Sequence, residues 1–523
     1  MIPPVCAEAG EGRAGKGDNI MVPSHIPVLV GVAQYTQRKG TSPLLDAVGL
    51  TAQAGRLALA DTGATADRLA RVIDCLCVVN YFCWNYRRAP DMVADMLGLA
   101  PRKALYTAVG GNTPQLLVNS FARAIAAGEC RAVLLTGGEA LYTLRHAMKA
   151  GQDLPWPAQE PPEAVEGDNR DGINRMEGDY DLYFPSFMYP LFETAVRASE
   201  GRTVAEHQRY MAGLYERFSA VAAGNPYAWG REPVAAQDIL EGPANRYIAY
   251  PYTKRMNAYI DVDQAAAVVM TSEAVADELG IDRALRVYPL GGAEFNNVWY
   301  VTQRPRLDDS PAMAAAARIS LEQAGLSLRD MDLFDLYSCF PCAVEMAMQA
   351  IGIRDDDPRP LTVTGGLAYF GGPGNNYTMH AIASVVERIR QNRSLKALVN
   401  ANGWYNTKHA AGIYGDRPER NTWGFRDDAP IQAAIDASAL PPPVEKAKGA
   451  LTVEAYVVRH DRNGRPEQGT VVGRLADGRR ALAHIQASEE GLYSLEAVEL
   501  VGRTGAVAYD EQEGRNRVSF DRI

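Results

Sequence analysis

Three segments in the second half of the sequence concentrate residues that could bind or react with a ligand. In residues 361–380, two glycine pairs, Gly365 with Gly366 and Gly371 with Gly372, lie between a β-branched stretch and an amphipathic run. A strand, a glycine-rich turn and a helix in that order leave backbone N–H groups open beside a ligand. The other two segments are the polar, cysteine-containing residues 335–342 and the Asn/Gly-rich residues 400–403. Together they predict one ligand site, whereas a single glycine-rich loop is equally typical of a surface turn.

Cys339 and Cys342 have the Cys-x-x-Cys spacing of a zinc or redox pair. No second pair in the sequence has matching ligand spacing, so packing at a strand–helix junction explains these two residues better. The chain has 7 cysteines, an odd number scattered through apolar segments, which favours a reducing cytoplasm. We therefore expect no metal site and a cytoplasmic location.

The composition is that of a globular protein of two to four domains. The 523 residues are 47 % hydrophobic and 22 % charged, with a formal net charge of −10. This negative balance argues against a nucleic-acid or anionic-membrane binder. No apolar run approaches the roughly 20 residues that span a bilayer. Residues 1–24 lack the apolar core of a secretory signal, and we expect a disordered leader with Met21 as an alternative start.

Strands and helices alternate in the first part of the chain, which is typical of a layered α/β fold. We expect strands at 25–34, 71–81, 104–109 and 132–137, and helices at 43–62, 89–99 and 115–128. Residues 151–250 differ, because they are rich in proline, aromatic and charged residues around one strong helix at 204–222. We interpret them as an insertion that caps the first half and supplies substrate contacts. The α/β pattern resumes at 262–271.

A second α/β round repeats this order of elements. The expected strands are at 286–291, 331–337, 362–364 and 396–400, and the expected helices at 311–324, 343–351 and 379–390. Residues 132–138 and 396–403 are similar in pattern, a strand that ends in a glycine-containing corner. The sequence therefore predicts a duplicated α/β fold with halves at 25–275 and 283–435.

The C-terminal region predicts a separate small β-barrel. Residues 436–447 contain three consecutive prolines and read as a linker. Beyond them, at 448–523, Asn463–Gly464 and Asp477–Gly478 separate apolar runs, the strongest short-range hairpin signal. One short helix is expected at 488–495. We predict an OB-like barrel, and no strand face combines aromatic and basic residues as nucleic-acid binding requires.

With these elements placed, the chain resembles the thiolase superfamily over about residues 26–415. The resemblance is carried by residues 124–128, 133–139, 225–228 and 264–269 and by the glycine loop at 365–373. The added barrel is similar to that of thiolase-like protein type 1, often labelled acetyl-CoA acetyltransferase. The resemblance implies a duplicated α/β/α/β/α layered fold with a small C-terminal barrel. It also implies an acyl-CoA thioester as substrate, acyltransferase activity in lipid metabolism and no covalently bound cofactor.

The catalytic positions of the family are all occupied by other residues in this chain. The nucleophilic cysteine falls at Gly111, and the His/Asn of the oxyanion hole falls at Tyr337. The Gly-His-Pro histidine falls at Gly372, and the last cysteine falls at Asn400 or Asn402. A thiolase needs its cysteine thiolate as the nucleophile. We therefore expect no cysteine acyl-enzyme.

Two functions agree with this pattern. In the first, the chain carries out C–C bond chemistry of the retro-aldol type on an acyl-CoA, as thiolase-like steroid aldolases do. Tyr337 would then be the acid/base at a β-hydroxyl, Asn402 would polarise the thioester, and His409 would be a candidate base. The plainer readings are a strand-end tyrosine bonded to a loop, and a histidine at a helix start or in packing. In the second function, the chain is a degenerate acyl-CoA-binding or scaffold subunit of a lipid- or steroid-metabolising complex.

The resemblance also implies which residues lie against the CoA thioester. These are Asn112, Thr113, Gly365, Gly366, Gly371, Gly372 and Gly403. Thr113 has a plainer reading as the N-cap of a helix that begins at Pro114. For assembly, the sequence leaves open a homodimer and a partner enzyme bound through the barrel.

Overall fold

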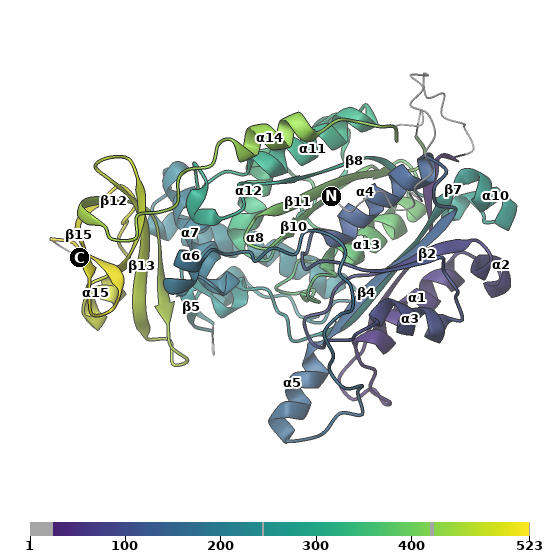
Figure 1. Ribbon diagram of the computed structural model, residues 1–523, viewed down its shortest axis with the longest axis horizontal. Helices are drawn as coiled ribbons and strands as arrows, with labels where there is room; N and C mark the ends of the chain where they lie inside the picture. The colour runs from purple at the N-terminus through teal and green to yellow at the C-terminus, as the bar shows by residue number, and fades with distance from the viewer. Residues whose placement is uncertain (1–24, 243–244, 419–422, 522–523) are drawn as a thin grey trace.

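The computed structural model describes residues 25–242, 245–418 and 423–521. The predicted leader at 1–24 lies outside the described residues. Two α/β halves are stacked on each other, and the C-terminal barrel stands at one end of the molecule (Figure 1). Among the described residues, no helix is long and apolar enough to cross a membrane.

The sheet of the N-terminal half has five strands. Their order is β1 (Pro27–Thr36), β7 (Asp263–Ser272), β4 (Ala132–Ala140), β2 (Ile73–Val78) and β3 (Lys103–Tyr106). β7 is antiparallel to both of its neighbours, whereas β4, β2 and β3 are parallel. β4 and β7 are buried along their whole length, which explains their near-continuous apolar sequences.

The sheet of the C-terminal half repeats this arrangement with four strands. Their order is β8 (Tyr288–Asn296), β11 (Lys408–Gly415), β10 (Ala397–Gly403) and β9 (Leu333–Asp335). In each half the last strand (β7 or β11) lies between the first strand (β1 or β8) and the second-to-last strand (β4 or β10). It is antiparallel to both of these neighbours. The strand beyond that, β2 or β9, pairs in parallel with β4 or β10. The predicted duplication is confirmed.

The strand predicted at 362–364 is not formed. Its backbone instead turns around the buried carboxylate of Asp335, which accepts hydrogen bonds from the N–H groups of Val363 (3.0 Å) and Thr364 (3.2 Å). The hydroxyls of Thr362 and Thr364 donate to the same oxygen. Because a side chain takes the place of a neighbouring strand here, β-branched residues do not extend the sheet.

Helices fill three layers around the two sheets (Figure 1). The central pair, α4 (Thr113–Ala126) and α13 (Tyr377–Gln391), contacts strands of both sheets. α1 (Ala47–Asp61) and α3 (Ala89–Leu97) cover the N-terminal sheet, and α11 (Pro311–Ala324) covers the C-terminal sheet beside α12 (Pro341–Ile351). The five predicted layers are confirmed. Smaller helices are α2 (Ala66–Ala70), α5 (Leu141–Ala150), α10 (Glu273–Leu279) and α14 (Ala429–Asp436).

The segment between β4 and β7 holds more structure than the single predicted helix. It contains α6 (Arg175–Asp179), α7 (Pro185–Ser199), α8 (Val204–Gly224), α9 (Ala236–Glu241), β5 (Tyr247–Tyr250) and β6 (Tyr252–Thr253). α8 matches the prediction and begins with a capping box between Thr203 and Glu206. The sequence analysis missed α7, because Pro185 and Pro190 and its aromatic residues obscure the helical period.

The C-terminal strands form a closed five-stranded barrel, which confirms the prediction. β12 (Lys448–His460), β13 (Pro466–Leu475), β14 (Arg480–Ile485), β16 (Arg515–Ser519) and β15 (Thr504–Asp510) pair in this order, and β15 returns to β12. α15 (Glu489–Ser494) follows β14. The barrel is continuous with the insertion, since β5 pairs with β12 and the buried Arg197 guanidinium bonds Glu499 at 2.6 Å.

Candidate functional site

The N-termini of the two central helices meet at one place, directly after the turn at Gly110–Gly111. The N–H of Gly110 donates to Asn375 Oδ1 (2.8 Å), and the Thr378 hydroxyl donates to the carbonyl of Gly111 (2.9 Å). The turn before α4 is thereby fastened to the start of α13. Helix N-termini carry partial positive charge, so this meeting point favours an oxygen that gains negative charge.

Tyr337 lies against Gly111 in this site. A Cβ atom added at Gly111 would stand 2.1 Å from the Tyr337 hydroxyl oxygen and 2.6 Å from the main-chain oxygen of Asn402. The phenol therefore fills the space that a side chain at position 111 needs. Burial, with a smaller effect of Cys339, raises the pKa of Tyr337 far above its ordinary value. The structure thus brings Tyr337 next to Gly111, the positions that the resemblance assigns to the oxyanion hole and to the nucleophile. The neutral phenol can donate a hydrogen bond.

The side-chain amide of Asn402, predicted to polarise a carbonyl, is oriented by Tyr189. The Tyr189 hydroxyl donates its single hydrogen to the Trp404 carbonyl (3.0 Å), so it must accept from Asn402 Nδ2 (3.0 Å) and from the N–H of Asn406 (3.1 Å). This fixes the amide orientation and leaves Asn402 Oδ1 as a buried atom without a partner. The free atom is an acceptor, whereas polarising a carbonyl needs a donor, and the role of Asn402 stays a prediction.

His409 is a structural residue of β11. It lies opposite Asn402 on the neighbouring strand, and its Nε2 is within 3.2 Å of both the Asn406 carbonyl and Asn297 Nδ2. Burial lowers the pKa of His409 to about 3. A fully buried imidazole that binds protons this weakly is a poor base. Because His409 lies in a strand, the helix-start reading is wrong; its burial agrees with the packing reading, and its catalytic role stays a prediction.

Gly365 and Gly366 face protein and not an open space. A Cβ at Gly365 would stand 2.4–2.5 Å from atoms of Ala222 on α8, and a Cβ at Gly366 would stand 2.6 Å from Phe218 and from the Ser338 hydroxyl. The two glycines therefore let the insertion helix approach this loop. The close neighbour that requires glycine is α8, and the assignment of these two glycines to the thioester stays a prediction.

The other predicted glycines differ in the space beside them. A Cβ at Gly371 would stand 2.4 Å from Gln264 Oε1, and one at Gly403 would stand 2.5 Å from Asn112 Oδ1. At Gly372 the nearest atom is 3.5 Å away, and its N–H donates to the carbonyl of Tyr259 (2.8 Å). Gly372 is therefore the member of the predicted set whose surroundings leave room for an added group.

Asn112 and Thr113 begin the central helix beside Gly111. α4 starts at Thr113, and Asn112 is its N-cap residue without a side-chain cap bond. The predicted cap is therefore displaced by one residue, a common uncertainty at helix ends. Asn112 Oδ1 is buried without a partner. A buried acceptor of this kind requires a donor from water or a ligand.

Lys408 is a functional candidate that the sequence analysis missed. Its ammonium donates to the carbonyls of Val109 (2.9 Å) and Asp168 (2.6 Å), so it joins the turn before Gly110 to the insertion. Burial lowers the pKa of Lys408 to about 8. A lysine inside an apolar strand was the available signal, because lysine is almost never buried without a specific partner.

Comparisons with known proteins place the chain in a family. Residues 430–512 match the domain described as "Thiolase-like protein type 1 additional C-terminal domain". The crystal structure of a monomeric SCP2-thiolase like protein type 1 from Mycobacterium smegmatis is 35 % identical and superposes with a TM-score of 0.81. The match covers 95 % of this chain and 99 % of that one. This chain belongs to the thiolase-like type 1 proteins.

More distant relatives agree with this thiolase-like assignment. The benzoylsuccinyl-CoA thiolase subunit BbsB of Thauera aromatica is 24 % identical over 178 residues, which are 34 % of this chain and 41 % of that protein. The chain thus matches less than half the length of this curated relative. An Ltp2–ChsH2(DUF35) aldolase structure has a TM-score of 0.57 at 17 % identity, covering 76 % of this chain and 100 % of that one, and shares the fold.

Proposed function

We propose that this chain binds an acyl-CoA thioester where α4 and α13 meet, and forms or breaks a C–C bond there without a cysteine acyl-enzyme. The observation that carries the proposal is the Tyr337 hydroxyl in the space beside Gly111 where a nucleophile's side chain would stand. BbsB is by its name a subunit of a CoA thiolase, which supports a CoA thioester as the ligand class. One protein with this fold is titled an aldolase, which supports aldol-type chemistry as the reaction class.

The chemistry follows from a neutral phenol next to two helix N-termini. In the condensing direction, water takes the proton from the carbon beside the thioester carbonyl, the enolate carbon formed in this way attacks a second carbonyl carbon, and the Tyr337 hydrogen passes to the oxygen that becomes a β-hydroxyl. The tyrosinate regains a proton from that water, so the proton lost by the thioester carbon replaces the one that Tyr337 gives. The helix N-termini stabilise the negative charge on the enolate oxygen. Because burial keeps Tyr337 protonated near neutral pH, it acts as the proton donor.

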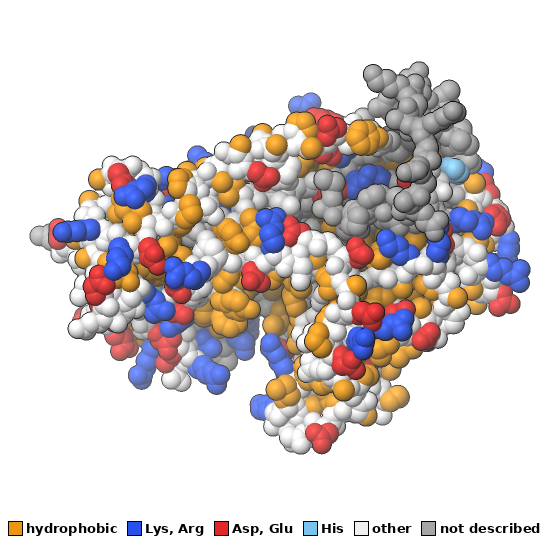
Figure 2. All heavy atoms as spheres, viewed as in Figure 1, with side chains coloured by type: hydrophobic (Ala, Val, Ile, Leu, Met, Phe, Trp, Pro, Cys, Tyr) orange, Lys and Arg blue, Asp and Glu red, His pale blue; other side chains and the backbone are white. Residues whose placement is uncertain are grey.

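A degenerate binding or scaffold subunit is the second candidate, and the closed site favours it. The site is almost fully buried, since the exposed fractions of Tyr337, Asn112 and Asn402 are 7 %, 4 % and 2 %. A ligand can reach these residues only after the residues packed over them move. The barrel would then serve a partner enzyme. We infer an OB-type barrel from its strand order, in which the third and fifth strands are parallel. On the face in Figure 2, positive and negative side chains are interspersed, which supports a partner other than nucleic acid.

The insertion also bears on assembly. Glu166 forms a bridge with Thr107 next to the edge strand β3, and its N–H donates to the carbonyl of Tyr106 (2.8 Å). An edge strand covered in this way cannot pair with the edge of a second copy. We therefore propose that the chain does not form a homodimer through this edge.

The deciding experiment compares binding and turnover of wild type and Tyr337→Phe. Calorimetry with a 3-hydroxyacyl-CoA should give the same dissociation constant for both proteins, while C–C cleavage by Tyr337→Phe should fall about a hundredfold or more. A wild type that binds but shows no turnover would support the scaffold. Acetoacetyl-CoA with CoA should give no thiolysis, and a trapped acyl-cysteine would overturn the proposal.

A further inference from the structure

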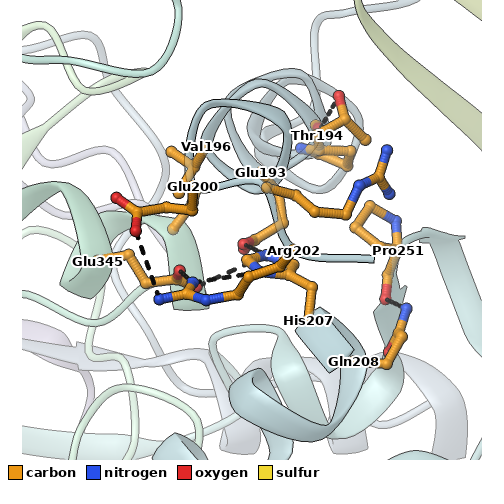
Figure 3. A network of polar contacts seen from close by, with 12 residues as sticks. Glu193, Thr194, Val196, Glu200, Arg202, His207, Gln208, Pro251 and Glu345 are labelled. Atoms are coloured by element: carbon orange, nitrogen blue, oxygen red, sulfur yellow. Dashed lines mark hydrogen bonds and ion pairs between the residues drawn. The ribbon is translucent and has the colours of Figure 1, made fainter. Parts of the chain in front are cut away.

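A second buried polar cluster lies between the insertion and α12 (Figure 3). Glu193 of α7, His207 of α8 and Glu345 of α12 have side chains that are 0 %, 1 % and 5 % exposed. His207 Nε2 lies 2.5 Å from Glu193 Oε1, and Tyr252 of β6 donates to Glu193 Oε2 (2.6 Å). Arg202, between α7 and α8, closes the cluster with a bond to Glu345 Oε2 (3.1 Å). Donors from α8 and β6 thus converge on the Glu193 carboxylate, and Glu345 of α12 lies beside it.

The contacts assign the protons in this cluster. Arg202 lies 3.4 Å from His207 Nδ1, and a guanidinium only donates, so Nδ1 accepts and Nε2 carries the hydrogen given to Glu193. Burial opposes the ionisation of Glu193, but the donors from His207 and Tyr252 outweigh it and lower the pKa of Glu193. Glu193 is therefore the anion of the cluster.

Glu345 is its protonated partner. Burial first, and then the charge of Glu193, raise the pKa of Glu345 well above the ordinary carboxyl range, and Arg202 offsets this only in part. Two carboxyl groups side by side share one proton for this reason.

A metal ion is a poorer occupant of this cluster. The ligand atoms of Glu193, His207 and Glu345 lie within 4.8 Å of one another, as in a metal site. A metal-bound imidazole, however, donates its second N–H to an acceptor, and here the second nitrogen faces the guanidinium of Arg202. Two neighbouring buried carboxyl groups, with Glu345 Oε1 left without a hydrogen-bond partner, fit the contacts better.

The cluster is one helical turn away from the candidate site. Tyr189 precedes Glu193 by four residues on α7, so both side chains lie on the same face of that helix. Tyr189 stacks on Phe340, the residue before α12 (4.5 Å between ring centroids, 23° between planes), and bonds Asn402 and Asn406. The seating of α7 on α12 therefore sets the turn at 402–406, whose main chain reaches Gly111.

We propose that Glu193, His207 and Glu345 form a proton-dependent latch that holds α7 closed over the candidate site. With Glu345 protonated, Glu193 carries the only carboxylate charge of the pair, α7 stays packed on α12, and Tyr189 fixes the turn at 402–406. When Glu345 loses its proton, two buried carboxylates repel each other and α7 loosens. The latch rests on the proposed function only in naming the site that it covers. The ionisable groups that face the pair are Arg202, Glu200, His207, Tyr210, Tyr252, Cys342 and Asp355.

Hydrogen exchange of the full-length chain tests the latch. From about pH 6 to the highest pH at which the chain stays folded, exchange in α7 and in 402–406, corrected for intrinsic rates, should rise at least tenfold in the wild type. Glu345→Gln keeps a neutral side chain of the same shape and should stay protected at both pH values. Glu200→Gln is the matched control, because Glu200 touches Arg202 from the surface (3.7 Å, 45 % exposed) and should behave as the wild type.

The sign of the pH effect follows from the protonated state of Glu345. A carboxyl whose pKa is raised by folding contributes stability at low pH, and this stability is lost as the pH rises. The unfolding midpoint of the wild type should therefore fall over the same pH interval, and that of Glu345→Gln should fall less. Equal pH dependence in Glu345→Gln and wild type would overturn the latch. If Glu345→Gln does not fold, the wild type decides, since pH-independent exchange in α7 overturns the latch by itself.

Thioester binding is measured separately, so the two proposals fail in different ways. Exchange that depends on pH in the wild type, and no longer depends on pH in Glu345→Gln, supports the latch even where no CoA ester binds. Binding of a CoA ester with equal affinity at both pH values, together with constant exchange, would reject the latch and retain the proposed function.

Discussion

The two glycine-rich turns of this protein look alike in sequence and differ in what approaches them. At Gly111 the neighbours are the Tyr337 hydroxyl and a main-chain oxygen, and the turn leads into a central helix. At Gly365 and Gly371 the neighbours are Ala222 of the insertion and Gln264 of β7. Glycine marks a close approach in both turns. Only the first turn has an ionisable side chain there, whereas the second packs against the insertion and against β7.

The largest expected effect is at Gly365. Gly365→Ala forces a Cβ to within 2.4–2.5 Å of Ala222, including its backbone, at a φ of +110°. Overpacking against a helix backbone and a strained φ together should cost roughly 3–5 kcal/mol of unfolding free energy. Urea unfolding followed by circular dichroism measures this loss.

Gly63→Ala is the matched control for backbone strain alone. Gly63 has a φ of +71° and no atom within 4 Å of the added Cβ, so the loss should be about 1 kcal/mol. Equal losses at the two glycines would show that packing against α8 is unimportant. The turn at Gly365 could then again be interpreted as a ligand-binding loop.

Lowering the pH should destabilise the protein through one buried histidine near each glycine-rich turn. His409 follows the strand turn beside Gly403, and His380 follows the second glycine loop. Burial lowers the pKa of both to about 3. Each therefore contributes stability above the ordinary histidine range, and this stability is lost as the pH falls. Unfolding free energy should drop by roughly 3 kcal/mol per histidine between about pH 6.5 and about pH 4.

Substitution separates the two histidines. His409→Gln and His380→Gln should each remove about half of this acid sensitivity, as denaturant unfolding at a series of pH values can measure. An unchanged pH profile in His409→Gln would mean that folding does not shift the pKa of this imidazole, and the base role would have to be reconsidered.

Local pattern was enough to predict the layers, the duplication and the barrel, because strand and helix periods depend on neighbouring residues. It failed where a distant side chain decides. Asp335 replaces the strand expected at 362–364, and Tyr189 fixes the orientation of Asn402 from a helix whose prolines concealed it. Glycine by itself could not reveal whether Ala222 or a ligand lies beside Gly365. The sequence singled out Gly111 and Tyr337, which lie side by side in the structure, but the surroundings of their neighbours required contacts.

A moderate effect is expected from the pair Gly111 and Tyr337. Gly111→Ala places a Cβ 2.1 Å from the phenol oxygen, and Tyr337→Ala removes that obstacle but not the Asn402 carbonyl at 2.6 Å. The double-mutant cycle should therefore show a favourable coupling of about 2 kcal/mol in unfolding free energy. Additive losses would mean that the two residues do not compete for this space.

For the same reason, Gly111→Cys should not create a thiolase. Its thiol would need the volume of the phenol, so acetyl-CoA should leave no acyl-cysteine detectable by mass spectrometry. Formation of that adduct in Gly111→Cys would show that Tyr337 moves aside readily, and the first turn would then differ from a thiolase site only by the missing sulfur.

The smallest change in stability is expected at Gly372. An added Cβ there meets Leu367, the Tyr259 carbonyl and Ala258 at 3.5–3.7 Å, which are ordinary contacts. Gly372→Ala should therefore cost less than about 0.5 kcal/mol of unfolding free energy. If the thioester passes this glycine, its affinity should nevertheless fall severalfold by calorimetry, since a methyl group would stand in its path. Unchanged affinity together with unchanged stability would leave Gly372 outside the site, and ligand contact would then be confined to the turn at Gly111.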